Sequence, residues 1–406
     1  MRTLEEHRAA VLALVDPLAP VRLPVGSALG LVLAEDVVAA VDLPGFDNSA
    51  MDGYAVRAAD LAGATPEHPV VLPVVGDVAA GDTARHVLPP GRAMRIMTGA
   101  PLPEGADAVV PVELSDGGSR SVALSLEPQV GRHLRHRGED VRAGDVVLRA
   151  GARLGPGHLA LAAAANVARL SVHPRPRVTV VSTGDELAPP GSVLQHGQIV
   201  DSNQVMLRAL VEAAGAEVAA ALHLADDAAA VRAFVAEPTG RPDLVVTSGG
   251  VSMGVHDTVK EVLTAEGGVD FVKVAVRPGM PQGSGLLGRS RTPVVTLPGN
   301  PVSSFASFHV FALPVIRRLA GADPADDGSF EAVAGEAWST VAGKVELTRV
   351  VETRDGVRPS GAQGSHVLGA LAEATALAVV PAEVERVEPG DPVRCIPLLG
   401  QDRRHG

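Results

Sequence analysis

Strand and helix patterns alternate through the middle of the chain, from residue 177 onward. Residues 178–183, VTVVST, form a run of mostly β-branched side chains, which is typical of a buried parallel strand. A helix is predicted after a cap at Asp201 or Ser202, because apolar residues then recur at helical spacing as far as Gly215. The alternation continues with predicted strands at 218–222, 244–247 and 294–297 and helices at 227–236, 258–265 and 301–319. It predicts an α/β domain with a largely parallel sheet, which binds ligands at the carboxyl ends of its strands.

β-rich segments precede and follow this region. Residues 46–130 contain short Val-rich runs broken by Gly and Pro, which predict a small β-dominated domain. Short helices are expected on either side of it, at 4–14 and 158–167. After residue 323, short strands around an RDG turn predict a small β-barrel or sandwich. The expected fold class is therefore α/β and multidomain, with β-rich N-terminal domains and a small C-terminal β-barrel.

The composition narrows the classes of function. The chain has 406 residues, of which 46% are hydrophobic and 20% charged, as in ordered globular proteins. A net charge of -12 argues against general binding to nucleic acid or to anionic membranes, and 2% aromatic residues leave few platforms for stacking bases. The single cysteine, Cys395, excludes an intrachain disulfide and a multi-thiolate metal site. The N-terminus does not resemble a signal peptide and the densest apolar runs are too short to span a bilayer, so we expect a cytoplasmic protein without membrane partners.

Three glycine-containing loops directly follow predicted strands of the α/β domain. Glycine lets the backbone approach a ligand closely, and free N–H groups at a helix start attract anions. Ordinary loop and cap chemistry explains any one of these loops, but three at one sheet edge favour an anion site. Neither a Walker loop nor G-x-G-x-x-G spacing is present. The candidate binding residues in the loops are Ser182, Thr183 and Gly184; Ser248, Gly249, Gly250 and Ser252; and Pro298, Gly299, Asn300 and Ser303.

Acidic residues cluster at the same strand ends, where a hard cation such as Mg²⁺ would suit them. They are Asp185, Glu186, Asp226, Asp227 and Asp257. Helix capping is the alternative for Asp227 and Asp257, and it is weaker for Glu186, which starts no predicted helix.

Two further segments and one histidine are ambiguous from the residues alone. The loop 44–56 carries Asp52 and the only tyrosine, and an Asx-turn would explain it equally well. The basic run 132–137 is either an anion site or a solvated, salt-bridged surface. His309 falls in an apolar helix and is interpreted as a packed core histidine.

Eight motifs in order along the chain resemble those of the molybdopterin molybdenumtransferases, a family of bacterial enzymes related to the C-terminal part of gephyrin. They are PGFDNSAMDGYAV, RIMTGAP, RGEDV, STGDEL, GQIVDSN, SGGVSMG, LPGNPVSS and GAQGSH. The resemblance implies the last step of molybdenum cofactor synthesis, in which adenylylated molybdopterin and molybdate give the cofactor and AMP with Mg²⁺ as metal. It also implies an elongated homodimer whose cleft lies between the α/β domain of one subunit and the N-terminal domains of the other.

The resemblance further implies four domains per subunit. We place them at 1–45 together with 131–175, an elongated discontinuous domain; 46–130, an inserted β-rich domain; 176–322, the molybdopterin-binding domain; and 323–406, the C-terminal barrel.

Site residues follow from the same motifs, position by position. The resemblance implies catalytic roles for Asp52, Thr98, Glu186, Asp257 and Lys273, with Asp52, Glu186 and Asp257 as metal ligands. It implies substrate contacts for Arg137, Asp140, Asp226 or its neighbour Asp227, Arg277 and Ser365. The chain departs from the family at 277–281, RPGMP, because many members carry Lys-Pro-Gly-Lys-Pro there.

Two other functions compete with this hypothesis. A molybdopterin adenylyltransferase shares the α/β module, but it is usually one small domain with a GGTG loop. A non-catalytic molybdopterin-binding or scaffold protein would not need the acids at Asp52, Glu186 and Asp257. The expected partners are a molybdopterin adenylyltransferase and cofactor-receiving molybdoenzymes.

Overall fold

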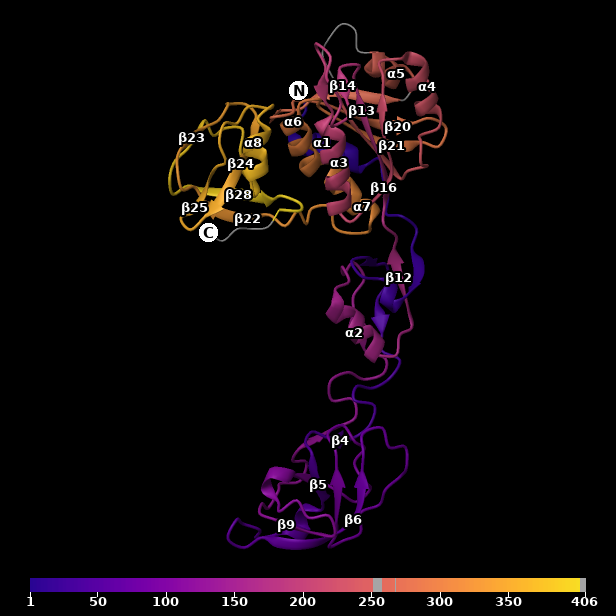
Figure 1. Cartoon of the computed structure of the whole chain (residues 1–406), viewed down its shortest axis with the longest axis vertical. Coiled ribbons are helices and arrows are strands. Elements are labelled where there is room, and N and C mark those ends of the chain that lie inside the picture. The colour runs from indigo at the N-terminus through magenta and orange to yellow at the C-terminus, as the bar shows by residue number, and fades with distance from the viewer. Residues whose placement is uncertain (251–257, 267, 402–406) are drawn as a thin grey trace.

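The molecule is elongated, with two adjoining bodies at one end and a thinner extension that carries a third body at the other (Figure 1). The computed structural model describes residues 1–401 except 251–257 and 267. Within these described residues, no helix is long and apolar enough to cross a membrane.

The central body is built on a six-stranded sheet of order β16-β13-β17-β21-β20-β18. Strands β16, β13, β17 and β21 are parallel, as predicted, whereas β20 and β18 are antiparallel additions. The sequence pattern missed β20 because its glycines do not look like a strand. A Cβ at Gly283 would lie 2.3 Å from the Thr296 Oγ1 atom, so close strand packing requires glycine there. The strands are Arg177–Thr183 (β13), Glu217–Leu224 (β16), Leu244–Ser248 (β17), Val269–Lys273 (β18), Pro281–Leu287 (β20) and Thr292–Leu297 (β21).

Helices cover both faces of this sheet and begin where the sequence predicts. The carboxylates of Asp201 and Asp227 accept backbone N–H bonds at the starts of α3 and α4, so both residues are caps. The predicted helix 301–319 is one continuous rod with a π-helical turn, η4, in its middle. His309 in that turn is fully buried, which confirms the core interpretation. The helices are α3 (Ser202–Ala213), α4 (Ala228–Ala236), α5 (Thr258–Ala265), α6 (Pro301–Ser307), η4 (Phe308–Ala312) and α7 (Leu313–Leu319).

The N-terminal helix α1 (Leu4–Leu12) packs on this central body and not on the extension. Leu4, Val11 and Val15 belong to the same apolar cluster as α7 and η4. Residues 1–45 are predicted to belong to the elongated domain, and within that range the apolar face of α1 is buried against the α/β core.

The second body is the C-terminal sheet, of order β19-β24-β26-β28-β22 with β25 beside β24. Its edge strand β19 (Val276–Arg277) comes from the central part of the chain and pairs in parallel with β24 (Val345–Thr353). This strand pairing connects the C-terminal body to the central body. The other elements here are β22 (Phe330–Val333), β23 (Trp338–Ser339), β25 (Gly356–Pro359), α8 (Leu368–Glu373), β26 (Ala376–Val380), β27 (Arg386–Val387) and β28 (Pro392–Pro397).

In the described residues, the extension contains four further sheets, two of which are two-stranded, and the helix α2 (Pro156–Ala164). Near the central body lie β1 (Val21–Pro24), β12 (Arg169–His173) and β2 (Val32–Leu33), with β3 (Val37–Val38) paired to β11 (Val146–Leu148). At the far end a five-stranded sheet has the order β8-β5-β7-β6-β9, formed by Ala108–Pro111, Gly53–Val56, Ala93–Ile96, Val70–Val78 and Ser121–Leu124.

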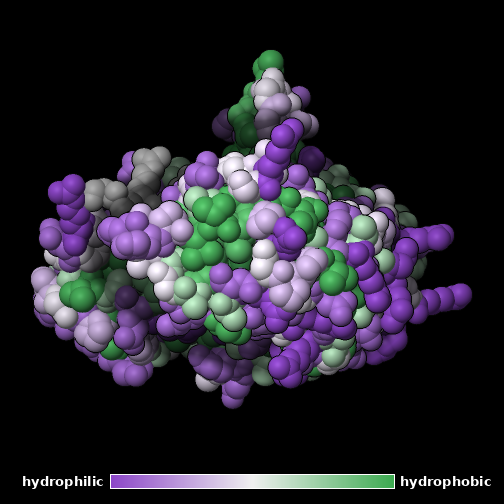
Figure 2. All heavy atoms as spheres, turned by 90° about the horizontal axis from the view of Figure 1, so that it is seen from below, coloured by the Kyte–Doolittle hydropathy of each residue, from purple (hydrophilic) through white to green (hydrophobic). Residues whose placement is uncertain are grey.

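Figure 2 looks at the molecule from this far end and shows hydrophobic residues gathered within a mostly hydrophilic surface. The exposed apolar residues of the far sheet include Val71 and Val75 on β6.

The predicted domain boundaries remain a prediction, and two strand pairs cross them. One is β19 with β24. The other joins β4 (Asn48–Ser49) to β10 (Leu134–Arg135), between the far sheet and the segment that leads back to the central body.

Candidate functional site

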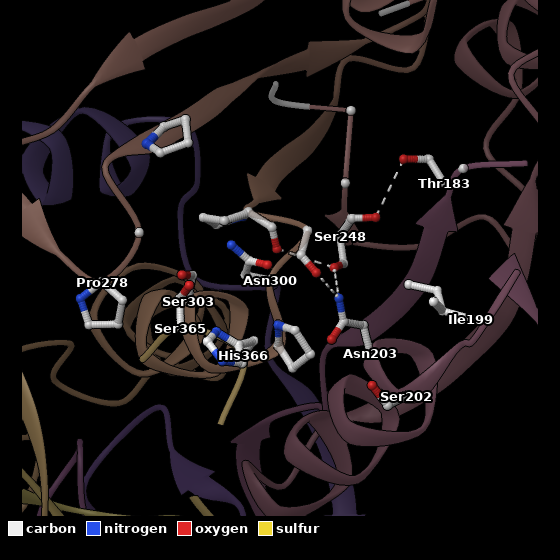
Figure 3. Close-up of a pocket in the computed structure, with 18 of the residues that line it drawn as sticks. Thr183, Ile199, Ser202, Asn203, Ser248, Pro278, Asn300, Ser303, Ser365 and His366 are labelled. Carbon is white, nitrogen blue, oxygen red and sulfur yellow. Dashed lines mark hydrogen bonds between the residues drawn. The ribbon is translucent and has the colours of Figure 1, made fainter. Parts of the chain in front are cut away.

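A pocket of about 1040 Å³ lies at the carboxyl ends of β13, β17 and β21. Its walls also include residues 276–281 and, from the C-terminal body, Lys344 and residues 363–366. In Figure 3, Thr183 and Ile199 lie on one side, Pro278 on the opposite side, and Ser248 and Asn300 between them. The position agrees with the rule that such sheets bind ligands beyond their carboxyl strand ends.

Most residues predicted from the three loops meet in this pocket. Ser182 is an exception, since it is buried and its Oγ atom accepts a bond from the Gln204 Nε2 atom at 3.4 Å. Lys273 is exposed at the end of β18 and is not part of the pocket lining, and Ser252 and Asp257 lie outside the described residues. The predicted residues that line the pocket are Thr183, Gly184, Glu186, Asp226, Ser248, Gly249, Gly250, Arg277, Pro298, Gly299, Asn300, Ser303 and Ser365.

Asn203 holds two of the loops together. Its Nδ2 atom donates to the Ser248 Oγ atom at 2.7 Å and to the Gly299 carbonyl at 2.6 Å (Figure 3). The motif GQIVDSN contains Asn203, but its role was not predicted, because nothing local indicates which loops the first turn of α3 will face.

The glycines of the second loop are required by close packing. Gly249 has φ +93°, and a Cβ there would lie 2.6 Å from the Thr183 Oγ1 atom. Gly250 has φ +64°, and its Cβ would lie 2.8 Å from a methyl group of Val259. A side chain at either position would clash with these neighbours, so the shape of the loop that lines the pocket depends on both glycines.

One side of the pocket is acidic. Glu186 folds back over Gly184, so that a Cβ on that glycine would meet a Glu186 carboxylate oxygen at 2.4 Å. Asp226 also lines the pocket, and its N–H donates to the Asp185 Oδ1 atom at 3.0 Å, which links two strand ends. Glu186 and Asp226 thus bring carboxylate oxygens, the donors that Mg²⁺ prefers, to one wall.

Two positively charged side chains, Arg277 and Lys344, also line the pocket, and Arg277 precedes Pro278, which lies opposite Thr183 in Figure 3. The Arg277 Nη1 atom lies 3.5 Å from the Glu346 Oε2 atom, next to which the Lys344 side chain adds a second positive charge. Burial raises the pKa of Glu346, and the charges of Arg277 and Lys344 oppose that rise. Lys344 was not predicted, because only the pairing of β19 with β24 brings it beside residues 276–281.

A buried arginine organises the loop that carries Ser365 into the pocket. Arg349 is 1% exposed and donates to the carbonyls of Ala362 and Val367 at 2.7 Å each and to that of Gly364 at 3.3 Å. The Ser365 carbonyl in turn accepts the N–H of Val302 from α6 at 3.2 Å. The loop is therefore fixed at both bodies.

Asp52 and Thr98 meet each other, but far from this pocket. The Asp52 Oδ1 atom accepts the backbone N–H of Thr98 at 2.6 Å and its hydroxyl at 2.8 Å. These bonds, the backbone bond foremost, lower the pKa of the exposed Asp52 carboxyl and keep it ionised. The two residues flank β5 and β7 of the far sheet, at the opposite end of the molecule (Figure 1).

Arg137 and Asp140 also lie in the extension and not in the pocket lining. Arg137 donates to a carboxylate oxygen of Asp42 at 2.5 Å, and His136 lies 3.7 Å from an Asp47 carboxylate oxygen. This part of the basic run is salt-bridged and largely solvent-exposed, which agrees with its interpretation as a solvated, salt-bridged surface.

Of the three predicted metal ligands, the two that the structure describes lie far apart within one chain. Asp52 lies at the far end, Glu186 lies in the pocket, and Asp257 falls outside the described residues. In the described part of the chain, no three or more His, Cys, Asp and Glu side chains come close enough together to hold a metal ion.

Three family models together cover most of the sequence. Residues 2–166 match the MoeA N-terminal region (domain I and II), residues 179–318 a probable molybdopterin binding domain, and residues 331–398 the MoeA C-terminal region (domain IV). The chain is also 46% identical over 398 residues to molybdopterin molybdenumtransferase 2 of Mycobacterium tuberculosis, covering 96% of this chain and 98% of the relative. The chain belongs to the molybdopterin molybdenumtransferase family. This confirms the predicted transferase activity in molybdenum cofactor biosynthesis.

Other members of the family agree in sequence and in fold. The molybdopterin molybdenumtransferase of Haemophilus influenzae is 37% identical, with 98% of this chain and all of that protein covered. The crystal structure of a molybdopterin biosynthesis MoeA protein from Pyrococcus horikoshii superposes with a TM-score of 0.82 at 30% identity, covering 98% of this chain and 99% of that one. The multidomain α/β fold predicted from the sequence is thereby confirmed.

Proposed function

We propose that the pocket at the sheet edge binds adenylylated molybdopterin and that the Asp52–Thr98 pair of a second copy of the chain completes the site for molybdate insertion. The observation that carries the proposal is the separation of the two groups. Both match motifs of one transferase family, yet one lines the pocket and the other lies at the far end of an elongated molecule. A symmetric dimer brings such separated groups together, since each chain then supplies the half that its partner lacks.

The pocket residues have the chemistry to hold a phosphorylated substrate. The backbone N–H groups of the glycine loops suit phosphate oxygens, and Arg277 and Lys344 place two positive charges on one wall. Glu186 and Asp226 on the other wall fit Mg²⁺, because hard cations take carboxylate oxygens. When bound there, Mg²⁺ supplies positive charge that stabilises the phosphates as AMP leaves.

Asp52 brings an ionised carboxylate in a fixed orientation. Thr98 occupies one of its oxygens with two hydrogen bonds, and the other oxygen, which accepts no bond from the described residues, can accept from a partner. On the facing subunit, that oxygen would help to bind the metal or to orient molybdate beside the substrate. Arg137 and Asp140, with the substrate contacts that the motifs imply, would approach from the same subunit.

The reaction places the chain between two other activities. It takes a substrate that an adenylyltransferase makes and gives a cofactor that molybdoenzymes receive, and we propose that this takes place in the cytoplasm.

The experiment is complementation between two inactive variants. Asp52→Asn and Glu186→Gln are each expected to abolish molybdate-dependent AMP release in their homodimers. After subunit exchange, a 1:1 mixture should recover about a quarter of wild-type turnover, since half of the dimers are mixed and each holds one intact site. A mixture as inactive as its components, with exchange verified by tagged subunits, would contradict the shared site. Absence of AMP release from the wild type would favour the scaffold alternative.

A further inference from the structure

The segment 277–281 forms one wall of the pocket, and a buried amide lies directly behind it. Gln282, the second residue of β20, is 1% exposed and is not part of the pocket lining. Its Nε2 atom donates to the Gly279 carbonyl at 2.6 Å and to the Ser307 Oγ atom of α6 at 2.7 Å. A buried amide is costly unless it is hydrogen-bonded; these two bonds satisfy its nitrogen, whereas its Oε1 atom has no hydrogen-bond partner among the described residues.

The orientation of this amide follows from its partners. The Gly279 carbonyl can only accept, so the nitrogen of the Gln282 amide and not its oxygen must face it. The same nitrogen then reaches Ser307, and one amide group connects the pocket wall to the long helix rod.

The segment 277–281 packs closely against the long helix formed by α6, η4 and α7. Gly279 has φ +101°, and a Cβ there would lie 2.6 Å from the Ser307 Oγ atom and 3.4 Å from the Ser303 carbonyl. The neighbouring Met280 carbonyl accepts the N–H of Val274 at 2.8 Å. Two consecutive carbonyls of the segment are thus hydrogen-bonded by groups that do not line the pocket.

We propose that Gln282 is a positioning residue that sets substrate affinity through the wall segment 277–281 without touching substrate. The inference rests on the proposed function, because the segment is read as part of the substrate pocket. Without the amide, the Gly279 carbonyl would lose its side-chain partner, and the turn between Arg277 and Met280 would be less firmly fixed. Binding would then have to restore the ordered wall, which raises KM more than it lowers kcat.

The test replaces the amide by a side chain of similar length without its donors. Gln282→Met should raise the KM for adenylylated molybdopterin at least about tenfold and change kcat by less than about threefold. Hydrogen exchange of the amides at 277–282 should rise in the same variant while the rest of the sheet stays protected. Ser307→Ala removes one of the two bonds and should give a smaller shift in the same direction. Gln129→Met, at an exposed position of the far body, is the control and should change neither quantity.

The outcomes separate this inference from the proposed function. An unchanged KM and unchanged exchange in Gln282→Met would overturn the positioning role while AMP release by the wild type left the function intact. A fall in kcat at constant KM would also overturn it, because it would indicate loss of folded enzyme. If the wild type released no AMP, the proposed function would fail, and the exchange measurement would still decide whether Gln282 orders the wall.

Discussion

The pocket and the Asp52–Thr98 pair are built in opposite ways. The pocket walls are held by the half-buried Asn203 between two loops and by two buried groups, Arg349 behind a third loop and Gln282 behind a fourth. Asp52 and Thr98 are both exposed and are hydrogen-bonded to each other on a separate body. The contrast indicates a division of labour, in which one region binds a large substrate with many fixed contacts and the other delivers a single charged group.

Removing the delivered charge should have the largest effect. Asp52→Asn keeps the shape of the side chain but loses the negative charge, so molybdate-dependent AMP release should fall at least about two orders of magnitude. The melting temperature and the affinity for adenylylated molybdopterin should stay as in the wild type, because Asp52 is exposed and the pocket lies elsewhere. Glu113→Gln, an exposed acid of the same body, is the matched control. Wild-type turnover in Asp52→Asn would show that the far body delivers no essential charge.

Replacing the buried Arg349 should lower turnover less than Asp52→Asn does, but it should lower the stability of the fold more. Arg349→Met removes the arginine donors from the carbonyls of Ala362 and Val367, while the Gly364 carbonyl keeps the N–H of Val367, so we expect roughly 2–4 kcal/mol of unfolding free energy to be lost. Activity per folded molecule should fall about tenfold, because the Ser365 loop is no longer fixed. Denaturant unfolding and AMP release measure the two effects. Full stability in this variant would indicate that the loop holds itself.

Changing the basic wall should affect binding more than chemistry. Arg277→Ala should raise the KM for adenylylated molybdopterin about tenfold and lower kcat much less, since the charge contacts the substrate in ground and transition states alike. Lys344 should retain part of the attraction. Arg289→Ala, an exposed arginine of the same body, should leave both constants unchanged. An unchanged KM in Arg277→Ala would exclude Arg277 from substrate binding.

A fall in pH should have the smallest effect, and it should destabilise the central body without changing the charge of Asp52. Burial lowers the pKa of His7 and of His309 to about 4, so both stay neutral in the folded central body. The unfolded chain takes up these protons below its own pKa near 6.5, so stability falls as the pH drops from about 6.5 to 4, by up to roughly 3 kcal/mol per histidine. Asp52 behaves differently, because its lowered pKa keeps the carboxylate ionised and bonded to Thr98 across this window.

The measurement is thermal unfolding across that pH range. His7→Leu should flatten the decline, since His7 packs edge-on against Phe311 and its ring nitrogens make no hydrogen bond to any described residue. The exposed His68→Leu should not change it. An equally steep decline in His7→Leu would assign the acid sensitivity to other groups.

The sequence predicted what depends on neighbours along the chain. Periodicity and caps located α3, α4 and the long rod, and the turn residues after three strands located most of the pocket. It did not reveal what depends on segments distant in sequence. Lys344 enters the pocket only through the pairing of β24 with β19, and Ser182 points into the core because of the register of β13. In the sequence nothing distinguishes Arg349 from a surface arginine, because the loop that buries it lies further along the chain.

The β19–β24 pair has a consequence for the evolution and engineering of this chain. The Val345 N–H donates to the Ala275 carbonyl at 2.9 Å, so backbone hydrogen bonds attach the C-terminal sheet to the edge of the pocket. A chain shortened before residue 323 would not be a smaller enzyme with an intact cavity. It would lose the part of the pocket wall that contains Lys344 and Ser365, and it would expose the unpaired edge of β19 in its place. Exchange of C-terminal sheets between relatives is therefore a way to alter ligand preference, because the graft carries part of the cavity with it.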